Sequence, residues 1–171
     1  LEVEHLVFNF ADDFDRDVVQ PYVDDHARGL TPNPCIECNR HLKFDRLLER
    51  AVALGFDAIA TGHHASIVST SAGPRLGRAI DAAKDQSYVL HMLGGQQLER
   101  LLLPIGALTK DEVRARAASL GLRTATKPDS QDVCFIARAD GGRSAFLRDR
   151  IDLHPAEVVD EHGVRLGSVD G

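Results

Sequence analysis

The feature that most constrains this chain is an apolar stripe followed at once by a short run of strand-forming residues. The stripe recurs at helical spacing and consists of Leu42, Phe44, Leu47, Leu48 and Val52. It predicts a helix at 39–54, which Gly55 ends. A buried-type strand is expected next, at 56–61, and another is expected upstream, at 6–10. This order of strands and helices favours an α/β fold, a parallel sheet with flanking helices, in which ligands bind beyond the carboxyl ends of the strands.

Periodicity and turn residues predict further elements along the chain. They are helices at 15–27, 85–92, 110–120 and 144–151 and β-hairpins at 66–79 and 156–166. The clearest end signals flank the third of these helices, where Thr109 is the expected N-cap, Glu112 completes a capping box and Gly121 follows the last turn. The last hairpin is expected to begin a second, β-rich domain.

Composition is that of a soluble globular protein. The 171 residues are 43% hydrophobic and 27% charged, and they suffice for one good-sized domain or for one domain with part of another. No apolar run is long enough to span a membrane, and the first ten residues lack the features of a signal peptide. Three cysteines are too few for a disulfide-stapled secreted protein, so a cytoplasmic location is expected. The net charge of −6 argues against a wholly nucleic-acid-binding surface but allows a local patch.

Two of the three cysteines lie in one stretch, TPNPCIECNRHLKF at 31–44, where a proline-stiffened loop precedes the predicted helix. The residues alone leave several readings open. Cys35, Cys38 and the distant Cys134 fit three ligands of a zinc site with a histidine as the fourth. The CxxC pair also fits a redox dithiol, and Cys38, directly before the helix, is placed as an activated nucleophile. The remaining reading is that both are small residues packed in a loop.

Other candidate residues give weaker signals. Cys134 stands between Val133 and Phe135, a setting more typical of a buried thiol than of a reactive one. His63 and His64 follow the second predicted strand. Because adjacent residues of an extended chain point to opposite faces, at most one of these histidines is expected in a site.

Two polar stretches have simple interpretations. The run DAAKDQSY at 81–88 is typical of a solvated loop, and KDEVRAR at 110–116 is typical of the outer face of an amphipathic helix. The second stretch also offers Lys110, Arg114 and Arg116 as phosphate contacts.

Four blocks, in this order, resemble the tRNA-specific 2-thiouridylases, enzymes that sulfurate the wobble uridine of certain tRNAs. The blocks are TPNPCIECNRHLKF, ATGHHA (60–65), KDQSYVL (84–90) and LPIGALTKDEVRARAASLGLRTATKPDSQDVCFI (103–136). The resemblance extends over nearly the whole chain. It implies the remainder of an adenine-nucleotide α-hydrolase-like catalytic domain at 1–83, a helical tRNA-binding and persulfide region at 84–154, and the start of a central β domain at 155–171.

The resemblance also implies roles for individual residues. Cys38 matches the nucleophilic or resolving cysteine, Cys134 matches the cysteine that carries a persulfide, and Gly62 matches a nucleotide-contacting glycine. The tRNA-contacting positions correspond here to Asn33, Pro34, Cys35, His63, Lys84, Asp85 and Gln86. The last three of these oppose the reading of 81–88 as a merely solvated loop. The implied cofactor is ATP with Mg²⁺, and no metal ligand of the chain itself is implied.

In the reaction that the resemblance implies, ATP adenylates the C2 oxygen of uracil, so that a poor leaving group departs with AMP. The persulfide sulfur of Cys134, or hydrosulfide that Cys38 releases from it, then attacks C2, and a Cys38–Cys134 disulfide remains. The two cysteines are 96 positions apart (134 − 38), so closure of a mobile segment on tRNA binding is expected. The implied partners are tRNAs for lysine, glutamate and glutamine, and a cysteine desulfurase or sulfur-relay protein.

Two departures from the family pattern limit these implications. Some members carry an aspartate where Cys35 stands, so Cys35 is left out of the catalytic pair. The family's phosphate loop, a Ser-Gly-Gly-Val-Asp-Ser type run, and its C-terminal β-barrel do not occur in the 171 residues. A fragment that binds ATP poorly and is inactive alone is therefore expected.

The alternatives belong to other functional classes. One is a non-catalytic tRNA-binding module with structural or zinc-binding cysteines. Another is a thiol–disulfide oxidoreductase that uses Cys35 and Cys38 without Cys134. A methyltransferase is not expected, because the sequence contains no glycine-rich methyl-donor loop.

Overall fold

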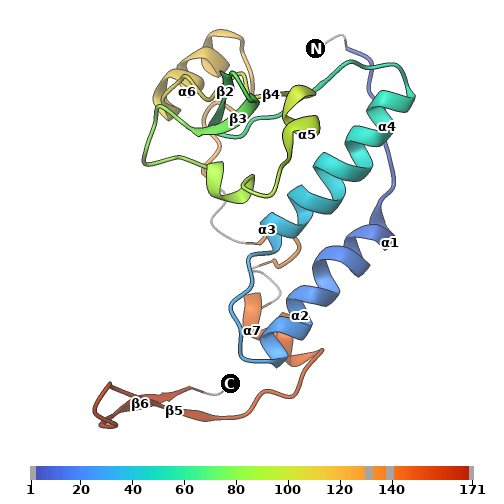
Figure 1. Cartoon of the computed structure of the whole chain (residues 1–171). Coiled ribbons are helices and arrows are strands. Elements are labelled where there is room, and N and C mark those ends of the chain that lie inside the picture. The colour runs from blue at the N-terminus through green and yellow to red at the C-terminus, as the bar shows by residue number, and fades with distance from the viewer. Residues whose placement is uncertain (1–2, 130–132, 138–140, 170–171) are drawn as a thin grey trace. The chain divides into compact units, whose positions relative to one another are not determined.

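The computed structural model describes residues 3–129, 133–137 and 141–169 (Figure 1). The chain divides into two compact units, the first with residues 1–18 and 33–129 and the second with residues 19–32 and 130–171. The functional regions predicted with boundaries at residues 83 and 154 are defined differently from these compact units, and they remain a prediction. No helix in the described part is long and apolar enough to cross a membrane.

The first helical segment consists of α1 (Ala11–Phe14), the π-helical η1 (Asp15–Val19) and α2 (Gln20–Ala27). Gly29, whose φ is +76°, follows its last turn. The strand predicted at 6–10 is wrong, since these residues belong to none of the sheets in the described chain. Val7 is 79% exposed, and no strand of the described residues pairs with this segment to stabilise it.

The helix predicted at 39–54 is present and begins earlier than expected. It consists of α3 (Pro34–Glu37), the π-helical η2 (Cys38–Arg46) and α4 (Leu47–Ala53). Its buried apolar face includes Leu42, Phe44 and Leu48. Pro34 permits the early start because the first helical position needs no backbone N–H. Cys38 therefore lies after the first turn and not directly before the helix, which corrects the expectation.

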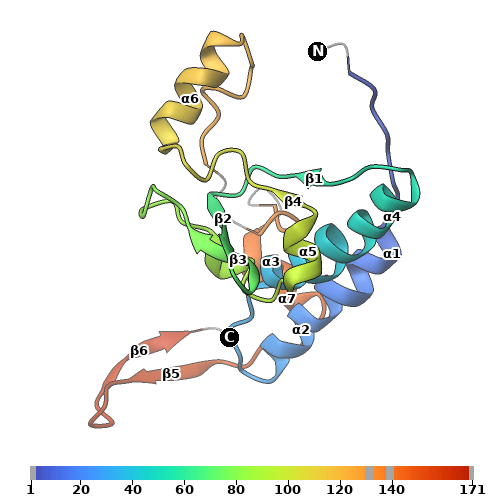
Figure 2. The ribbon, with the colours of Figure 1, turned by 45° about the horizontal axis from the view of Figure 1, so that its top comes forward.

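A parallel strand pair forms one sheet of the first unit (Figure 2). β1 (Ile59–Ala60) pairs with β4 (Leu101–Leu102), and Ile59 lies opposite Leu101. The short helix α5 (Gly95–Glu99) leads directly into β4. Parallel pairing next to helices confirms the predicted α/β class, although the strand expected at 56–61 is shorter than predicted.

An antiparallel hairpin, β2 (Ala65–Thr70) and β3 (Gly73–Arg78), confirms the prediction for 66–79. The loop after β4 packs against the beginning of this hairpin. A Cβ atom on Gly106 would lie 1.7 Å from the carbonyl oxygen of Ala65. The carbonyl of Gly106 also accepts a hydrogen bond from the N–H of Ile80 at 3.0 Å. Glycine at this position is therefore required by close backbone packing.

The helix predicted at 85–92 is wrong, because only the 3-10 turn η3 (Ser87–Val89) forms there. Asp85 explains the difference. Its carboxylate accepts hydrogen bonds from the N–H of Ala79 at 2.8 Å and from the hydroxyl of Ser87 at 2.7 Å, which favours a turn over a helix. By contrast, α6 (Lys110–Ser119) is confirmed together with its capping box.

The second unit contains α7 (Gly142–Arg148) and the hairpin of β5 (Ala156–Val159) with β6 (Arg165–Val169). Both elements confirm the predictions for this region. Each unit has its own apolar cluster. The cluster of the first unit consists of Phe44, Ala65, Val89, Leu90, Leu93, Leu98 and Leu101. The cluster of the second unit has Tyr22, Ile136 and Leu147 as its buried residues.

Candidate functional site

The candidate site begins at the turn that leads into α3. Asn33 caps the helix, since its Oδ1 accepts a hydrogen bond from the N–H of Cys35 at 3.1 Å. Pro34 is buried, and Cys35 is exposed in the first turn. Cys38 follows three residues later and is half-buried. Because residues three apart share one side of a helix, both thiols lie on the same side of this segment.

Asn39 fixes the helix directly after Cys38, and sequence reasoning missed it. It is only 1% exposed, and its Nδ2 donates a hydrogen bond to the carbonyl of Val89 at 2.9 Å. Its Oδ1 has no hydrogen-bond partner among the described residues. The bond joins the cysteine-bearing helix to η3. The available signal was a polar residue at helical spacing from Leu42 on the apolar stripe.

Gly62 and His63 follow β1 at the carboxyl end of the parallel pair. A Cβ atom on Gly62 would meet no atom within 4 Å, so open space adjoins its backbone. The His63 ring lies 5.9 Å from the Phe44 ring between centroids, and its Nδ1 is 2.9 Å from the hydroxyl of Thr61. Burial and the nearby charge of Lys43 lower the pKa of His63 to about 4, so the ring is neutral at pH 7.

His64 has different surroundings. It is 4% exposed, and its two ring nitrogens have no hydrogen-bond partner in the described part of the chain. Its N–H donates to Oε1 of Gln86 at 2.9 Å, and its carbonyl accepts from the N–H of Gln86 at 2.7 Å. Burial, and then the charge of Lys110, lower the pKa of His64. The structure thus brings two predicted stretches, 62–64 and 84–86, into direct contact.

The three polar residues at 84–86 differ in their roles. Lys84 places its ammonium group near the surface, 2.9 Å from the carboxylate of Asp129. Asp85 and Gln86 direct their side chains to the hydrogen bonds described above. Burial opposes ionisation of Asp85, but its hydrogen bonds outweigh this effect and lower its pKa. The contact of these three residues with tRNA remains a prediction.

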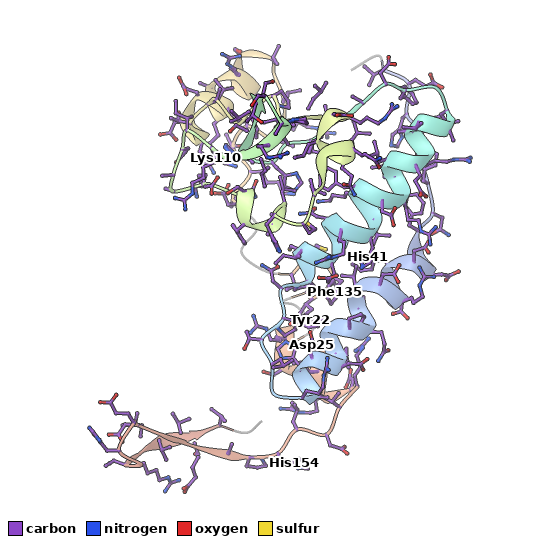
Figure 3. All side chains as sticks on the ribbon, in the orientation of Figure 1. Tyr22, Asp25, His41, Lys110, Phe135 and His154 are labelled. Atoms are coloured by element: carbon purple, nitrogen blue, oxygen red, sulfur yellow. The ribbon has the colours of Figure 1, made fainter. Side chains whose placement is uncertain are left out.

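Cys134 belongs to the second unit, where its thiol is exposed. It lies in a turn in which the N–H of Ile136 donates to the carbonyl of Val133 at 3.0 Å. The neighbouring Phe135 packs edge-on against Tyr22, with ring centroids 5.5 Å apart (Figure 3). Apolar neighbours therefore anchor this segment while the thiol stays at the surface, contrary to the buried setting that the flanking residues suggested.

The cysteines are divided between the units. Cys35 and Cys38 belong to the first and Cys134 to the second, and all three are thiols. The pairing of Cys38 with Cys134 remains a prediction. Among the described residues, no group of three or more His, Cys, Asp or Glu side chains is arranged to hold a metal ion. The zinc interpretation therefore gains no support from this part of the chain.

The parallel strand pair, the helices beside it and the glycine–histidine loop at the strand end define a Rossmann-like α/β protein. The family model described as "tRNA methyl transferase HUP domain" matches residues 1–138, and the chain belongs to this family.

Curated relatives specify the resemblance further. The chain is 51% identical to a protein of Thermobifida fusca over 99% of this chain and 45% of the relative. It is 49% identical to a protein of Acidothermus cellulolyticus over 100% of this chain and 47% of the relative. Both relatives are named tRNA-specific 2-thiouridylase MnmA. The resemblance seen in the sequence is thereby confirmed, and the chain spans less than half the length of these relatives.

Proposed function

We propose that the chain is part of an enzyme that thiolates the wobble uridine of tRNA at C2. The observation that carries this proposal is that two cysteines are at least partly exposed to solvent and lie in segments that neighbouring residues hold in place. Cys38 is half-buried next to the fixed Asn39, and Cys134 is exposed between packed apolar neighbours. Sulfur transfer that ends in a protein disulfide uses one thiol that carries the sulfur and another that releases it. Identity of 49–51% to relatives named 2-thiouridylases supports the same reaction.

In this proposal Cys134 carries a persulfide and the Cys38 thiolate attacks its inner sulfur. The persulfide S–S bond breaks, hydrosulfide leaves with the electron pair, and a Cys38–Cys134 disulfide forms. Hydrosulfide then attacks C2 of the adenylated uracil, the C2–O bond breaks, and the oxygen leaves with its electron pair as part of AMP. Direct attack by the persulfide sulfur followed by release through Cys38 gives the same products. A thiol reductant afterwards restores both cysteines.

ATP with Mg²⁺ is the proposed activating cofactor, and it supplies the adenylyl group that turns the C2 oxygen into a leaving group. Gly62 fits a nucleotide contact because open space adjoins its backbone. Binding of the phosphates needs a glycine-rich loop of the family type, which the 171 residues do not contain. We therefore assign no residue of this chain to binding of the ATP phosphates.

The proposed tRNA contacts are Asn33, Pro34, Cys35, His63, Lys84, Asp85 and Gln86. Exposed Cys35 and Lys84 are available for direct contact. Asn33, Asp85 and Gln86 already use their side chains to fix the backbone, so we infer that they shape the surface that meets the RNA. The target uridine must leave its stack to reach the thiols. Lysine, glutamate and glutamine tRNAs and a cysteine desulfurase or sulfur-relay protein complete the proposed partners of a cytoplasmic reaction.

Replacement of Cys134 by serine, in the full-length enzyme that carries this chain, tests the proposal. We expect 2-thiouridine to disappear while adenylated tRNA still forms, because the change removes only the sulfur carrier. Mass spectrometry of nucleosides measures the first product, and transfer of label from ATP to tRNA measures the second. Normal thiolation by the variant would refute the proposal.

A further inference from the structure

A carboxylate of the first unit is surrounded by three cations from two separate segments. Oδ2 of Asp129 lies 2.9 Å from Nζ of Lys84, while Oδ1 lies 3.1 Å from Nζ of Lys110 and 3.4 Å from Nη2 of Arg114. Lys84 precedes η3, whereas Lys110 and Arg114 share one face of α6, at whose start Figure 3 labels Lys110. These four residues are called the Asp129 cluster below.

The Asp129 cluster keeps a surplus of positive charge. Hydrogen bonds from Lys84 and Lys110 lower the pKa of Asp129 to about 2, so the carboxylate is ionised at pH 7. Three cations and one carboxylate give the four residues a net charge of +2 (3 − 1), and the adjoining carboxylate of Asp81, which accepts a hydrogen bond from the N–H of Lys110, leaves a surplus of +1 (2 − 1). The side chains of Lys84 and Arg114 are each 42% exposed and that of Lys110 is 30% exposed. Donors that Asp129 does not use therefore remain accessible to an anion from solvent.

The backbone of the cluster is held in place before any ligand binds. The Asp81 side chain accepts a hydrogen bond from the N–H of Lys110 at 2.9 Å, and the Asp81 carbonyl accepts one from the N–H of Lys84 at 3.1 Å. One residue thus positions both lysines. Asp85 and Gln86, directly after Lys84, are anchored by their own hydrogen bonds. Groups that are already ordered lose less conformational entropy on binding, which favours a defined site over a diffuse basic surface.

We propose that Lys84, Lys110 and Arg114 together bind one backbone phosphate of the tRNA, and that Asp129 keeps the three cations aligned. This inference rests on the proposed tRNA substrate. Lysine and arginine are the usual contacts of RNA and DNA phosphates, and such contacts fix the register of the nucleic acid on the protein. The inference joins Lys110 and Arg114, which the sequence offered as phosphate contacts on a helix face, to Lys84 in a single site, and it gives Asp129 a positioning role.

The test compares Lys110→Gln and Arg114→Gln with Arg123→Gln in the full-length enzyme. Arg123 is a matched control because it is exposed shortly after the same helix and is not an ion-pair partner of Asp129 in the described part of the chain. Binding of an unmodified tRNA transcript is measured over a series of KCl concentrations. Each cluster variant is expected to weaken binding about three- to tenfold at about 0.1 M salt and to reduce the salt slope by about 1 relative to the control.

Two further measurements make the result decisive. Lys110→Arg keeps the charge and is expected to restore the salt slope, and circular dichroism verifies that each variant is folded. If Lys110→Gln does not fold, Arg114→Gln decides. Equal slopes for the cluster variants and Arg123→Gln would overturn the inference, whereas the proposed function would stand if the wild-type enzyme thiolates the tRNA. A wild-type enzyme without tRNA affinity would refute both.

Discussion

His63 shows how its surroundings set the chemistry of a single residue. The pKa of its ring is about 4, because burial and the charge of Lys43 oppose protonation. The ring is therefore neutral under physiological conditions and brings no charge to an RNA phosphate. Recognition by His63, which we propose, then depends on hydrogen bonding or stacking and not on electrostatic attraction.

The depressed pKa predicts a loss of stability in mild acid. A histidine titrates near 6.5 in the unfolded chain and here only near 4 in the folded one. Between these values the unfolded state binds more protons, so stability falls as the pH falls. Between pH 7 and pH 5 the unfolding free energy of the wild-type chain is therefore expected to fall by about 2 kcal/mol more than that of the His63→Gln variant. Urea denaturation at the two pH values measures it, and an unchanged loss would contradict the assigned pKa.

Asn39 gives a second prediction for a single residue. Asn39→Ala removes the only hydrogen bond that its side chain makes among the described residues and leaves the carbonyl of Val89 without that donor. We expect the free energy of unfolding to fall by about 1–2 kcal/mol. Asp45→Ala, on an exposed position of the same helix, is the control and is expected to change it by less than about 0.5 kcal/mol. Equal losses of unfolding free energy in the two variants would show that Asn39 does not anchor the helix.

At the scale of elements, the sequence predicted those whose signals are local. α6 was predicted with its cap because Thr109, Glu112 and Gly121 lie within or beside the helix. The strand at 6–10 was wrong because a strand depends on a partner, and its own residues do not say whether one is present. The helix at 85–92 was wrong because the carboxylate of Asp85 binds backbone and hydroxyl donors that periodicity does not take into account.

The candidate site was predicted only in part, because its contacts join residues that are far apart in the sequence. The motifs identified Cys38, His63 and Lys84, but they gave no information on which side chains meet. Lys84 and Asp129 are 45 positions apart, so their ion pair follows from the fold and from no local pattern. The same holds for Asn39, whose partner Val89 lies 50 positions later.

Gly106 gives a prediction about how elements pack. In Gly106→Ala the new Cβ would lie 1.7 Å from the carbonyl oxygen of Ala65 and 2.6 Å from its carbonyl carbon. The loop after β4 and the start of β2 must then move apart, and we expect a loss of about 1–3 kcal/mol in unfolding free energy. Gly95→Ala, where nothing lies within 4 Å, is the control and is expected to leave stability unchanged or raise it by about 0.4–1 kcal/mol. Chemical denaturation measures both, and equal stabilities would show that the loop adapts without cost.

At the scale of the whole molecule, the two compact units each have an apolar cluster and each carry part of the proposed chemistry. Cys38 belongs to the unit with the parallel strand pair, and Cys134 belongs to the unit built around Tyr22. The chain covers 45–47% of the length of the relatives described above. In the proposed reaction, one cysteine from each unit acts on the same uridine.

This division leads to a prediction about the products of a single turnover. Full-length enzyme loaded with persulfide and given ATP and tRNA, without reductant, is expected to form one Cys38–Cys134 disulfide for each 2-thiouridine. Both candidate attacking species lead to this bond, because Cys38 displaces the sulfur from Cys134 in either case. Mass spectrometry of peptides under non-reducing conditions identifies the linked pair, and a reaction without tRNA is the control. Thiolated tRNA accompanied by reduced Cys38 and Cys134 would contradict the prediction, and a Cys35–Cys38 disulfide in their place would transfer the resolving role to Cys35.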